Sequence, residues 1–534
     1  MISLSVYIFS FFAFVSSFIL ATIPILAIHN LYKNYARKRI LGLLKKSPTS
    51  KIVAFFHPYC DSGGGGERVL WTAIRCMLKK SDIAIVILTG DPKCLKNPDK
   101  VLSKVKDTFG LSFDEKKHTV HFQSICLQFL LEPSLYPVFT LAGQALGSIV
   151  VAVEAFIRCP VDIYIDTTGF AFTLPVFRLL SLRRIITAAY VHYPTVSSAM
   201  LSRLDLSASE RDIDSQITYN NPKWVRTSKN FTRIKQVYYR FLVSAYGWAG
   251  NPSNCHLVLA NSSWTRNHIK SLWGGSPSVL FPPCPTEFFS DYSVVDNEDV
   301  GRHKWIVSIG QFRPEKNHEL QLKSFALFLE KLGISKCKDS PYRLILVGGC
   351  RSLRDHARVN HLRYISNQMN LSEMVEFRIN LPYIEVVKLF KKATVNLHTM
   401  VEEHFGIGIV EGMAAGLITV AHNSGGPRYD IIGPTFQPTN DPVNDTSTGE
   451  IPEPKSLAYP NYLYASNCSY MSGTVGFLAG SAEEYANVFS HIFTIMRDSD
   501  LELMRSAAKH WTHSRFSEAC FESGWLEAFD PIFT

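Results

Sequence analysis

Residues 398–430 read HTMVEEHFGIGIVEGMAAGLITVAHNSGGPRYD, and the rest of the chain is organised around this stretch. The apolar run 395–397 before it predicts a short strand, and the glycines that follow predict a turn that opens a helix ending at Gly416. A second strand is expected at 418–421, followed by a polar glycine loop. This alternation is typical of α/β folds, which bind ligands in a crevice beyond the carboxyl ends of their parallel strands.

Two carboxylates within this stretch, Glu403 and Glu411, are separated by seven residues. Glu403 follows the strand and is expected in the crevice, whereas Glu411 lies about one to two helical turns further on, too far to share a proton with it. The start of the helix, at Phe405, Gly406 and Ile407, presents backbone N–H groups to the crevice. Such carboxylates and amides suit a sugar and a ribose. The same spacing also arises by chance on solvated helices, so it is not decisive alone.

A second ligand-facing loop is predicted near the start of the globular part of the chain. The buried strand 52–56 is followed by a glycine run, and a helix is expected over 67–78. The glycines of this run are Gly63, Gly64, Gly65 and Gly66. Glycine lets the backbone approach a ligand closely, and the helix start faces an anion. The loop is neither a P-loop nor a dinucleotide fingerprint, and a flexible turn is the alternative.

Three further side chains are expected at strand ends that face the same crevice. His192 ends a strand over 185–193, where it would donate a hydrogen bond to a hydroxyl or phosphate group near neutral pH. Arg313 and Lys316 follow a strand that begins at Trp305, and they supply the positive charge that a diphosphate leaving group needs. The alternatives are a histidine buried in the core and a surface turn with charged tips.

The amino terminus predicts a membrane anchor. Residues 1–30 contain no charged side chain and are long enough to cross a bilayer as one helix. Seven basic residues and no acidic one follow before residue 52, so the positive-inside rule places everything after the anchor in the cytosol. A cleaved signal peptide is the alternative, although no cleavage site is convincingly placed. The apolar segment 125–156 is expected to touch the membrane, with a core helix as its alternative.

Charge and cysteine content exclude several classes of protein. The net charge of +9 is concentrated in the basic flank, which leaves no basic domain for nucleic acid. The eleven cysteines form no C-x-x-C pair, which argues against a disulfide framework and a zinc site and fits a reducing compartment. Two D-x-D sequences, at 212–214 and 498–500, do not follow apolar strands and are interpreted as solvated turns. We therefore expect no metal and no other cofactor.

Several of these sequences together resemble a known family. EHFGIGIVE, followed by MAAG and SGGP, is similar to the donor-binding segment of retaining family-4 glycosyltransferases of the GT-B fold. The glycine loop, YVHYP at 190–194 and SIGQFRPEKNH at 308–318 occur in the order found in one branch of that group. The chain thus resembles the GDP-mannose-dependent α-1,2-mannosyltransferases of dolichol-linked oligosaccharide synthesis, and the resemblance covers nearly all residues after the anchor.

The resemblance implies an α/β protein with two Rossmann-like domains that face each other across a crevice. The expected parts are a transmembrane anchor at 1–30, a basic linker at 31–51, an acceptor domain at 52–290, a nucleotide-sugar domain at 300–515 and a helix at 516–534 that crosses back to the first domain. The family works on the cytosolic face of the endoplasmic reticulum. Other mannosyltransferases of the pathway are candidate partners.

The resemblance also implies a reaction, in which GDP-mannose adds the fourth and fifth mannose to Man3GlcNAc2-diphosphodolichol through α-1,2 linkages. Glu403 and the backbone of 405–407 would hold the mannose, and Glu411 would hold the ribose. Lys316 and Arg313 would stabilise the diphosphate, while the glycine loop would lie under the sugar and phosphates. His192 matches the family's active-site histidine. Retention without an obvious carboxylate nucleophile favours a front-face displacement, in which the leaving phosphate takes the acceptor proton.

The chain departs from the family pattern at two places. Gln311 stands where an arginine is common, so Arg313 is expected to reach the phosphate instead, and Ala199 stands where an aspartate is expected. Two alternatives remain open: a transferase of the same fold with another donor, such as UDP-N-acetylglucosamine, and a non-catalytic membrane-anchored scaffold. A scaffold would be expected to have lost Lys316, Glu403 or Glu411, and all three are present.

Overall fold

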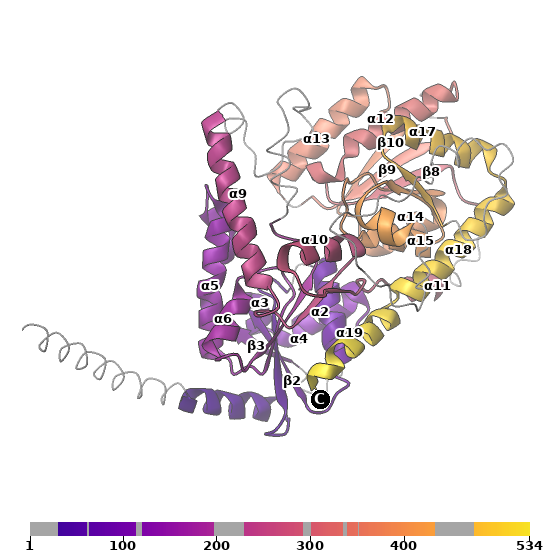
Figure 1. Ribbon diagram of the computed structural model, residues 1–534. Coiled ribbons are helices and arrows are strands. Elements are labelled where there is room, and N and C mark those ends of the chain that lie inside the picture. The colour runs from indigo at the N-terminus through magenta and orange to yellow at the C-terminus, as the bar shows by residue number, and fades with distance from the viewer. Residues whose placement is uncertain are drawn as a thin grey trace, which may run out of the picture.

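In the computed structural model, the chain forms two α/β domains, and each domain is built on one parallel sheet (Figure 1). The structure describes residues 30–60, 63–113, 120–196, 229–291, 301–334, 339–350, 352–432 and 475–533. The expected anchor up to residue 29, the D-x-D sequence at 212–214 and the departure at Ala199 lie outside these residues.

The sheet of the first domain has seven strands in the order β3-β2-β1-β4-β5-β6-β7. These strands are β1 (Lys51–Phe56), β2 (Ile83–Thr89), β3 (Val120–Ser124), β4 (Ile163–Asp166), β5 (Ile186–Val191), β6 (Leu257–Ala260) and β7 (Ser278–Val279). The apolar sequence of β1 is buried on both faces because helices cover both sides of a parallel sheet. Its side chains alternate between two cores, with Ile52 on one face and Val53 on the other.

Helices form a layer on each face of this sheet. The layer on the Ile52 side holds α5 (Thr140–Arg158), α6 (Thr173–Leu180), α9 (Lys229–Gly250) and a helix over 30–43, with the short 3-10 turns Cys126–Leu131 and Pro133–Leu135 beside α5. The layer on the Val53 side holds α2 (Gly65–Met77) and α4 (Pro98–Phe109), preceded by α3 (Pro92–Lys96). The helix α10 (Ser263–Trp273) follows β6 and lies towards the second domain (Figure 1).

The stretch that we expected as a basic linker differs in the structure, because 30–43 is helical and packs on the first domain. Ile40 and Leu41 are buried in the core beneath β1. Arg37 forms an ion pair with Asp162 at 2.8 Å, and the Lys33 ammonium lies over the Phe156 ring at 3.6 Å from its centroid. Ala36 and Ile40 are buried and four residues apart, so one face of this helix fixes the basic segment to the domain instead of leaving it as a spacer.

The sheet of the second domain has six strands in the order β10-β9-β8-β11-β12-β13. These strands are β8 (Trp305–Ile309), β9 (Arg343–Gly348), β10 (Val375–Ile379), β11 (Val395–Leu397), β12 (Ile418–His422) and β13 (Phe477–Ala479). The helices around them are α11 (Thr286–Asp291), α12 (His318–Lys331), α13 (Leu353–Gln368), α14 (Tyr383–Lys392), α15 (Ile407–Ala414), α17 (Ala482–Ser490) and α18 (Asp498–Phe516). Single turns complete the domain at Pro314–Lys316, Pro427–Ile431 and His491–Ile495.

The strand order of each sheet reverses at one strand, and this places the ligand-facing loops. In the first domain β1 lies between β2 and β4, and the glycine loop follows β1. In the second domain β8 lies between β9 and β11, and the loop with Lys316 follows β8. Open α/β sheets bind ligands at this reversal point, at the carboxyl ends of the strands. Both sheets therefore direct their reversal points to the space between the domains.

The chain returns to the first domain at its end. Figure 1 shows α18 and α19 (Glu518–Phe533) running in yellow from the second domain back to the first. At the crossing point the N–H of Cys284 donates to the carbonyl of Phe516 at 2.8 Å, so the outgoing and returning segments lie side by side. The fully buried Trp525 of α19 packs within the core of the first domain, where its ring stacks on Phe55. Arg75 of α2 holds Glu522 at 2.7 Å.

Candidate active site

The loop between β11 and α15 places Glu403 at the reversal point of the second sheet. Gly406 has a φ of +105°, and a Cβ there would lie 2.6 Å from the Ile409 side chain, so the turn into α15 requires glycine. The glycine loop after β12 supports the turn from behind, because the N–H of Gly426 donates to the carbonyl of Glu403 at 2.7 Å. A Cβ on Gly425 would lie 2.4 Å from that same carbonyl oxygen. Gly425 and Gly426 thus allow the loop after β12 to lie directly against the backbone of Glu403.

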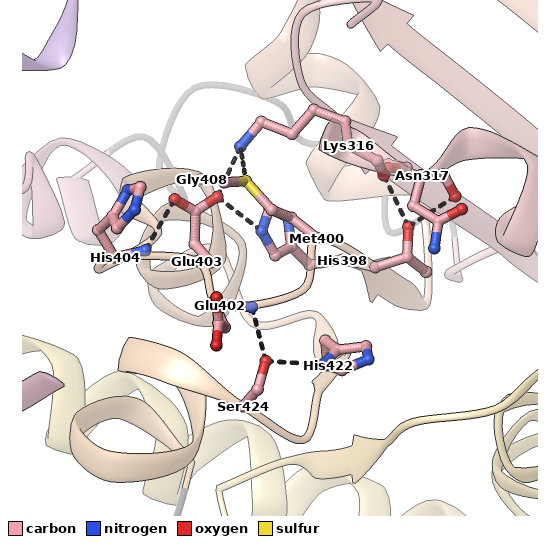
Figure 2. Close-up of polar contacts among 12 residues, drawn as sticks. Lys316, Asn317, His398, Met400, Glu402, Glu403, His404, Gly408, His422 and Ser424 are labelled. Atoms are coloured by element: carbon pink, nitrogen blue, oxygen red, sulfur yellow. Dashed lines mark hydrogen bonds and ion pairs between the residues drawn. The ribbon is translucent and has the colours of Figure 1, made fainter. Parts of the chain in front are cut away.

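Three donors converge on the Glu403 carboxylate (Figure 2). Its Oε2 accepts from Lys316 Nζ at 2.5 Å and from His398 Nε2 at 2.9 Å, and its Oε1 accepts from the backbone N–H of His404 at 3.2 Å. Burial alone would raise the pKa of Glu403, but hydrogen bonds and charge from His398 and Lys316 hold it well below its usual range. Glu403 is therefore ionised at neutral pH.

Lys316 is positioned by both loops of the second domain. Its ammonium group also lies 3.3 Å from the Met400 sulfur, and its stem passes over Gly310 at the end of β8. The hydroxyl of Thr399 donates to the carbonyl of Lys316 at 2.9 Å, which ties the β8 loop to the β11 loop. Lys316 and Glu403 thus form an ion pair. The sequence led us to expect both side chains in one crevice, but it did not predict that they pair.

The pair lies in a cavity of about 290 Å³ between the domains. The first domain contributes Gly65, Gly66, His192, Tyr193 and Asn261, and the second contributes Ile309, Lys316, His398 and the run 403–408, with Pro282 from the connecting segment. The cross-domain fit is close, because a Cβ on Gly65 would lie 2.7 Å from the Ile407 side chain. The ring of the lining residue Phe405 packs against Phe281 and Phe516.

His192 lines this cavity as a neutral imidazole. Its Nε2 is buried and has no hydrogen-bond partner among the described residues, while its ring also bonds to the Thr167 backbone. Burial lowers the pKa of His192 to about 4, so the ring is neutral near pH 7. The Nε2 atom of a neutral ring either donates or accepts a hydrogen bond, depending on the tautomer. The expected role of His192 as a donor to a hydroxyl or phosphate group therefore stays a prediction.

Two of the predicted glycines do not offer their amides to a ligand. The N–H groups of Gly63 and Gly64 both donate to the Glu67 carboxylate at the start of α2, the latter at 3.0 Å. Only Gly65 and Gly66 line the cavity. We expected all four glycines to bind the donor, and this expectation is corrected for Gly63 and Gly64. Their N–H groups are occupied by Glu67, which caps the start of α2.

Arg313 and Glu411 do not line the cavity either. The Arg313 side chain is half exposed and lies 3.9 Å from Glu315. Glu411 lies on α15 and accepts from the Tyr383 hydroxyl at 3.1 Å, and burial raises the pKa of its carboxyl group. The expected diphosphate role of Arg313 and ribose role of Glu411 thus stay predictions, since both side chains lie beside the cavity and not in it.

Several lining residues were not predicted. His398 and His404 lie within the stretch that opens the sequence analysis, but they were passed over in favour of the glutamates. The His404 ring contacts Tyr193 of the first domain, with ring centroids 4.2 Å apart. Asn261 donates to the carbonyl of His192 at 2.9 Å and so fixes the strand end that carries the histidine. His398 and Asn261 are singled out by side-chain bonds within their own domains, and His404 by its contact across the domains. Among the described residues, no group of three or more His, Cys, Asp or Glu side chains could hold a metal ion.

Solved structures share this fold. Anabaena Alr3699/HepE in complex with UDP and glucose aligns with a TM-score of 0.53 and 15% identity, over 90% of this chain and 99% of that one. Sucrose-phosphate synthase from Thermosynechococcus elongatus aligns with a TM-score of 0.57 and 12% identity, over 90% and 99% of the two chains. At these identities the similarity concerns the fold alone.

The two parallel-sheet domains give the chain a GT-B-like fold, and the family matches make it a glycosyltransferase. Two family models match, "ALG11 mannosyltransferase N-terminus" over residues 50–273 and "Glycosyl transferases group 1" over 295–436. The chain belongs to the family of GDP-Man:Man(3)GlcNAc(2)-PP-Dol alpha-1,2-mannosyltransferases.

Relatives with that name cover most of the chain. The human protein is 39% identical over 502 residues, which is 93% of this chain and 90% of the relative. The Dictyostelium discoideum protein is 35% identical over 91% and 86% of the two chains, and the Caenorhabditis elegans protein is 34% identical over 94% and 93%. The predicted family and enzyme class are confirmed, and neither alternative is favoured.

Proposed function

We propose that the cavity transfers mannose from GDP-mannose to Man3GlcNAc2-diphosphodolichol, adding the fourth and fifth mannose through α-1,2 linkages. The main support is the Lys316–Glu403 pair, which offers one cation and one ionised carboxylate at the reversal point of the second sheet. His192 and Gly66 face this pair from the first domain. A nucleotide sugar held on the second domain would thus present its anomeric carbon to an acceptor held on the first.

Lys316 acts on the leaving group in this proposal. Without a phosphate, its ammonium group pairs with the Glu403 carboxylate at 2.5 Å. When the donor binds, the ammonium group pairs with the diphosphate instead. Glu403 then accepts hydrogen bonds from mannose hydroxyls, with His398 keeping its carboxylate in place. A positive group directed at developing charge stabilises the transition state by a few kcal/mol, on the order of 3. Arg313, half exposed at the start of the same turn, adds a second positive charge.

The transfer proceeds with retention at the anomeric carbon. The bond from that carbon to the diphosphate oxygen breaks while the bond to the acceptor hydroxyl oxygen forms on the same face. The acceptor proton passes to the departing phosphate oxygen, so charge and atoms balance. Glu403 is a poor nucleophile because Lys316 and His398 hold the pKa of its carboxyl group low. The role of metal is taken by Lys316, and activity needs no divalent cation.

The enzyme works at the endoplasmic reticulum membrane in this proposal, with a single amino-terminal span and both domains in the cytosol. Residues 1–30 supply the span, and the basic residues that follow favour the cytosolic side. Among the described helices, one, Thr140–Arg158, is long and apolar enough to cross a membrane, although a third of its apolar window is buried. Other mannosyltransferases of the pathway are the proposed partners.

Purified full-length protein, reconstituted in vesicles with GDP-mannose and a Man3GlcNAc2-diphosphate lipid, tests the proposal. We expect a product with two more mannoses, both removed by an α-1,2-specific mannosidase. UDP-N-acetylglucosamine serves as the control donor and should give no product. Transfer from that donor, or no transfer from GDP-mannose by folded protein, would contradict the proposal.

A further inference from the structure

The start of α10 is capped by two side chains from different parts of the chain. Ser262 precedes the helix, and its hydroxyl accepts from the N–H of Thr265 at 3.1 Å, as is common for a serine at a helix start. The N–H of Ser263, the first residue of α10, instead donates to the carboxylate of Asp430 at 2.8 Å. Asp430 lies on the turn Pro427–Ile431 of the second domain, so one of the two caps joins the domains.

The Asp430 carboxylate is buried at this contact. Its residue is 5% exposed, and the Ser263 side chain bonds to it in addition to the N–H. Among the described residues, Ser263 is the only hydrogen-bond donor to this carboxylate. Burial raises the pKa of Asp430, while the bonds from Ser263 and the charges of Arg515 and Arg266 oppose the rise. A carboxylate is also favoured beside the partial positive charge of a helix N-terminus.

The segment before α10 holds the strand end that carries His192. Asn261 follows β6, and its N–H donates to the carbonyl of Val191 at 3.2 Å. Its side-chain amide donates to the carbonyl of His192 at 2.9 Å. The end of β5 is therefore bonded twice to Asn261, which lies only two residues before Ser263. A shift of the chain at the Asp430 contact would move His192 with it.

Asp430 is connected equally closely to the reactive pair of the second domain. The glycine loop that leads to its turn donates an N–H to the carbonyl of Glu403 at 2.7 Å. The next residue, His404, places its ring against two aromatic side chains of the first domain, with centroids 4.2 Å from Tyr193 and 5.1 Å from Trp264. Trp264 follows Ser263 in α10. The Asp430 contact and these ring contacts therefore occur where the domains meet beside the cavity.

We propose that Asp430 is a positioning residue for mannose transfer, which holds the first domain so that His192 lies opposite the Lys316–Glu403 pair. The inference rests on the proposed function, in which the second domain holds the donor and the first holds the acceptor. Groups on two domains react only when they are closely aligned, and a misplacement of about 1 Å costs roughly 10²-fold in rate. Asp430 does not line the cavity, so its effect on the reaction passes through the start of α10.

Asp430→Ala tests this role by separating turnover from donor binding. In full-length protein we expect kcat with the lipid-linked acceptor to fall at least about tenfold, because the two domains are no longer aligned. The affinity for GDP should stay within about twofold, because the change leaves the donor site of the second domain intact. Asp430→Asn keeps an oxygen that accepts from the Ser263 N–H and should recover most of the lost kcat.

Asp91→Ala is the matched control for these kinetics. Asp91 also accepts from a backbone N–H at a helix start, that of Lys93 at 2.9 Å, but this contact lies within the first domain. Its kcat should equal that of wild type. An unchanged kcat in folded Asp430→Ala, or a loss of GDP affinity that parallels the loss of kcat, would overturn the proposal.

Ser263→Pro removes the same contact from the first domain. Proline lacks the N–H and is favoured at the first position of a helix. Ser262 already has the extended backbone that a following proline requires, with φ of −160° and ψ of 163°, so α10 should still form, which a thermal melt checks. We expect Ser263→Pro to lower kcat as Asp430→Ala does, and the double variant to be no worse than either. Additive losses would contradict a shared contact.

Trp264 reports on the domain contact without any activity. This tryptophan is 8% exposed, and acrylamide quenching of its fluorescence measures its exposure in solution. Asp430→Ala should increase the quenched part of the emission, Trp264→Phe in the same variant should remove the increase, and Asp91→Ala should behave as wild type. If quenching responds in this way but wild type transfers no mannose, the proposed function fails and the Asp430 contact still positions the domains. Unchanged quenching in Asp430→Ala overturns the positioning role.

Discussion

Replacing Glu403 by glutamine should separate the chemistry of the site from simple binding. The carboxylate accepts from Lys316 at 2.5 Å, from His398 at 2.9 Å and from the His404 backbone at 3.2 Å. Glutamine keeps one oxygen acceptor but presents an N–H group where Lys316 and His398 also present donors. Loss of one charge-assisted contact that strengthens in the transition state costs about 2.7 kcal/mol, which corresponds to roughly a 10²-fold fall in kcat.

The assay measures initial rates of mannose transfer from labelled GDP-mannose to the lipid-linked acceptor. Glu402→Gln is the matched control, because it makes the same chemical change one residue away, and Figure 2 shows the Glu402 side chain pointing away from the Lys316–Glu403 pair. A thermal melt must show that both variants are folded at the assay temperature. Turnover of Glu403→Gln within threefold of wild type, or the same loss in Glu402→Gln, would refute the reasoning.

Four further outcomes follow from the structure. Glu411→Gln should chiefly raise the KM for GDP-mannose and weaken inhibition by GDP, and an equal fall in kcat and kcat/KM would contradict a ribose contact. Activity should survive EDTA, and an absolute requirement for Mn²⁺ in a metal-titration assay would exclude the proposed role of Lys316. Arg302 donates to the carbonyls of Phe390, Ala393 and Ala415. Arg302→Ala should therefore reduce the free energy of unfolding, measured in a urea titration, by about 2–4 kcal/mol. An unchanged free energy would show that these carbonyls find other hydrogen-bond donors. Because the pKa of His192 is lowered to about 4, its ring should stay neutral near pH 7, and kcat should not change with a pKa near 6.5. The free energy of unfolding should fall as the pH is lowered from about 6.5 to about 4, because the unfolded chain takes up the proton in this range and the folded chain does not.

Much of the fold could be predicted because buried parallel strands are apolar along their whole length. β1 was expected at 52–56 and is observed one residue longer, and the strand expected to begin at Trp305 is β8; both are buried on both faces. The edge strand β3 was missed, since its sequence VHFQS is only partly buried and lacks that signal. The segment 31–51 was expected to be a linker because its many basic residues outweigh the weak apolar spacing of Ala36 and Ile40.

The site was predictable where the strand directly before a residue fixes the position of that residue. Glu403 and Lys316 were expected in one crevice from their positions after β11 and β8, and they form an ion pair there. Arg313 follows the same strand as Lys316, yet its side chain turns to the surface. His404 could not be found, because its contact with Tyr193 depends on how two domains meet, and a sequence pattern within one domain does not contain that information.

The position of the last helix has a consequence for synthesis on the ribosome. Phe521, Trp525 and Phe529 belong to the core of the first domain, and Lys51 at its first strand donates to the carbonyls of Ile532 and Phe533. Domains generally fold as units while the chain emerges, the amino-terminal one first. Here the domain made first lacks part of its core until α19 has left the ribosome. A premature stop codon just before α19 would therefore damage a part of the protein that is synthesised much earlier.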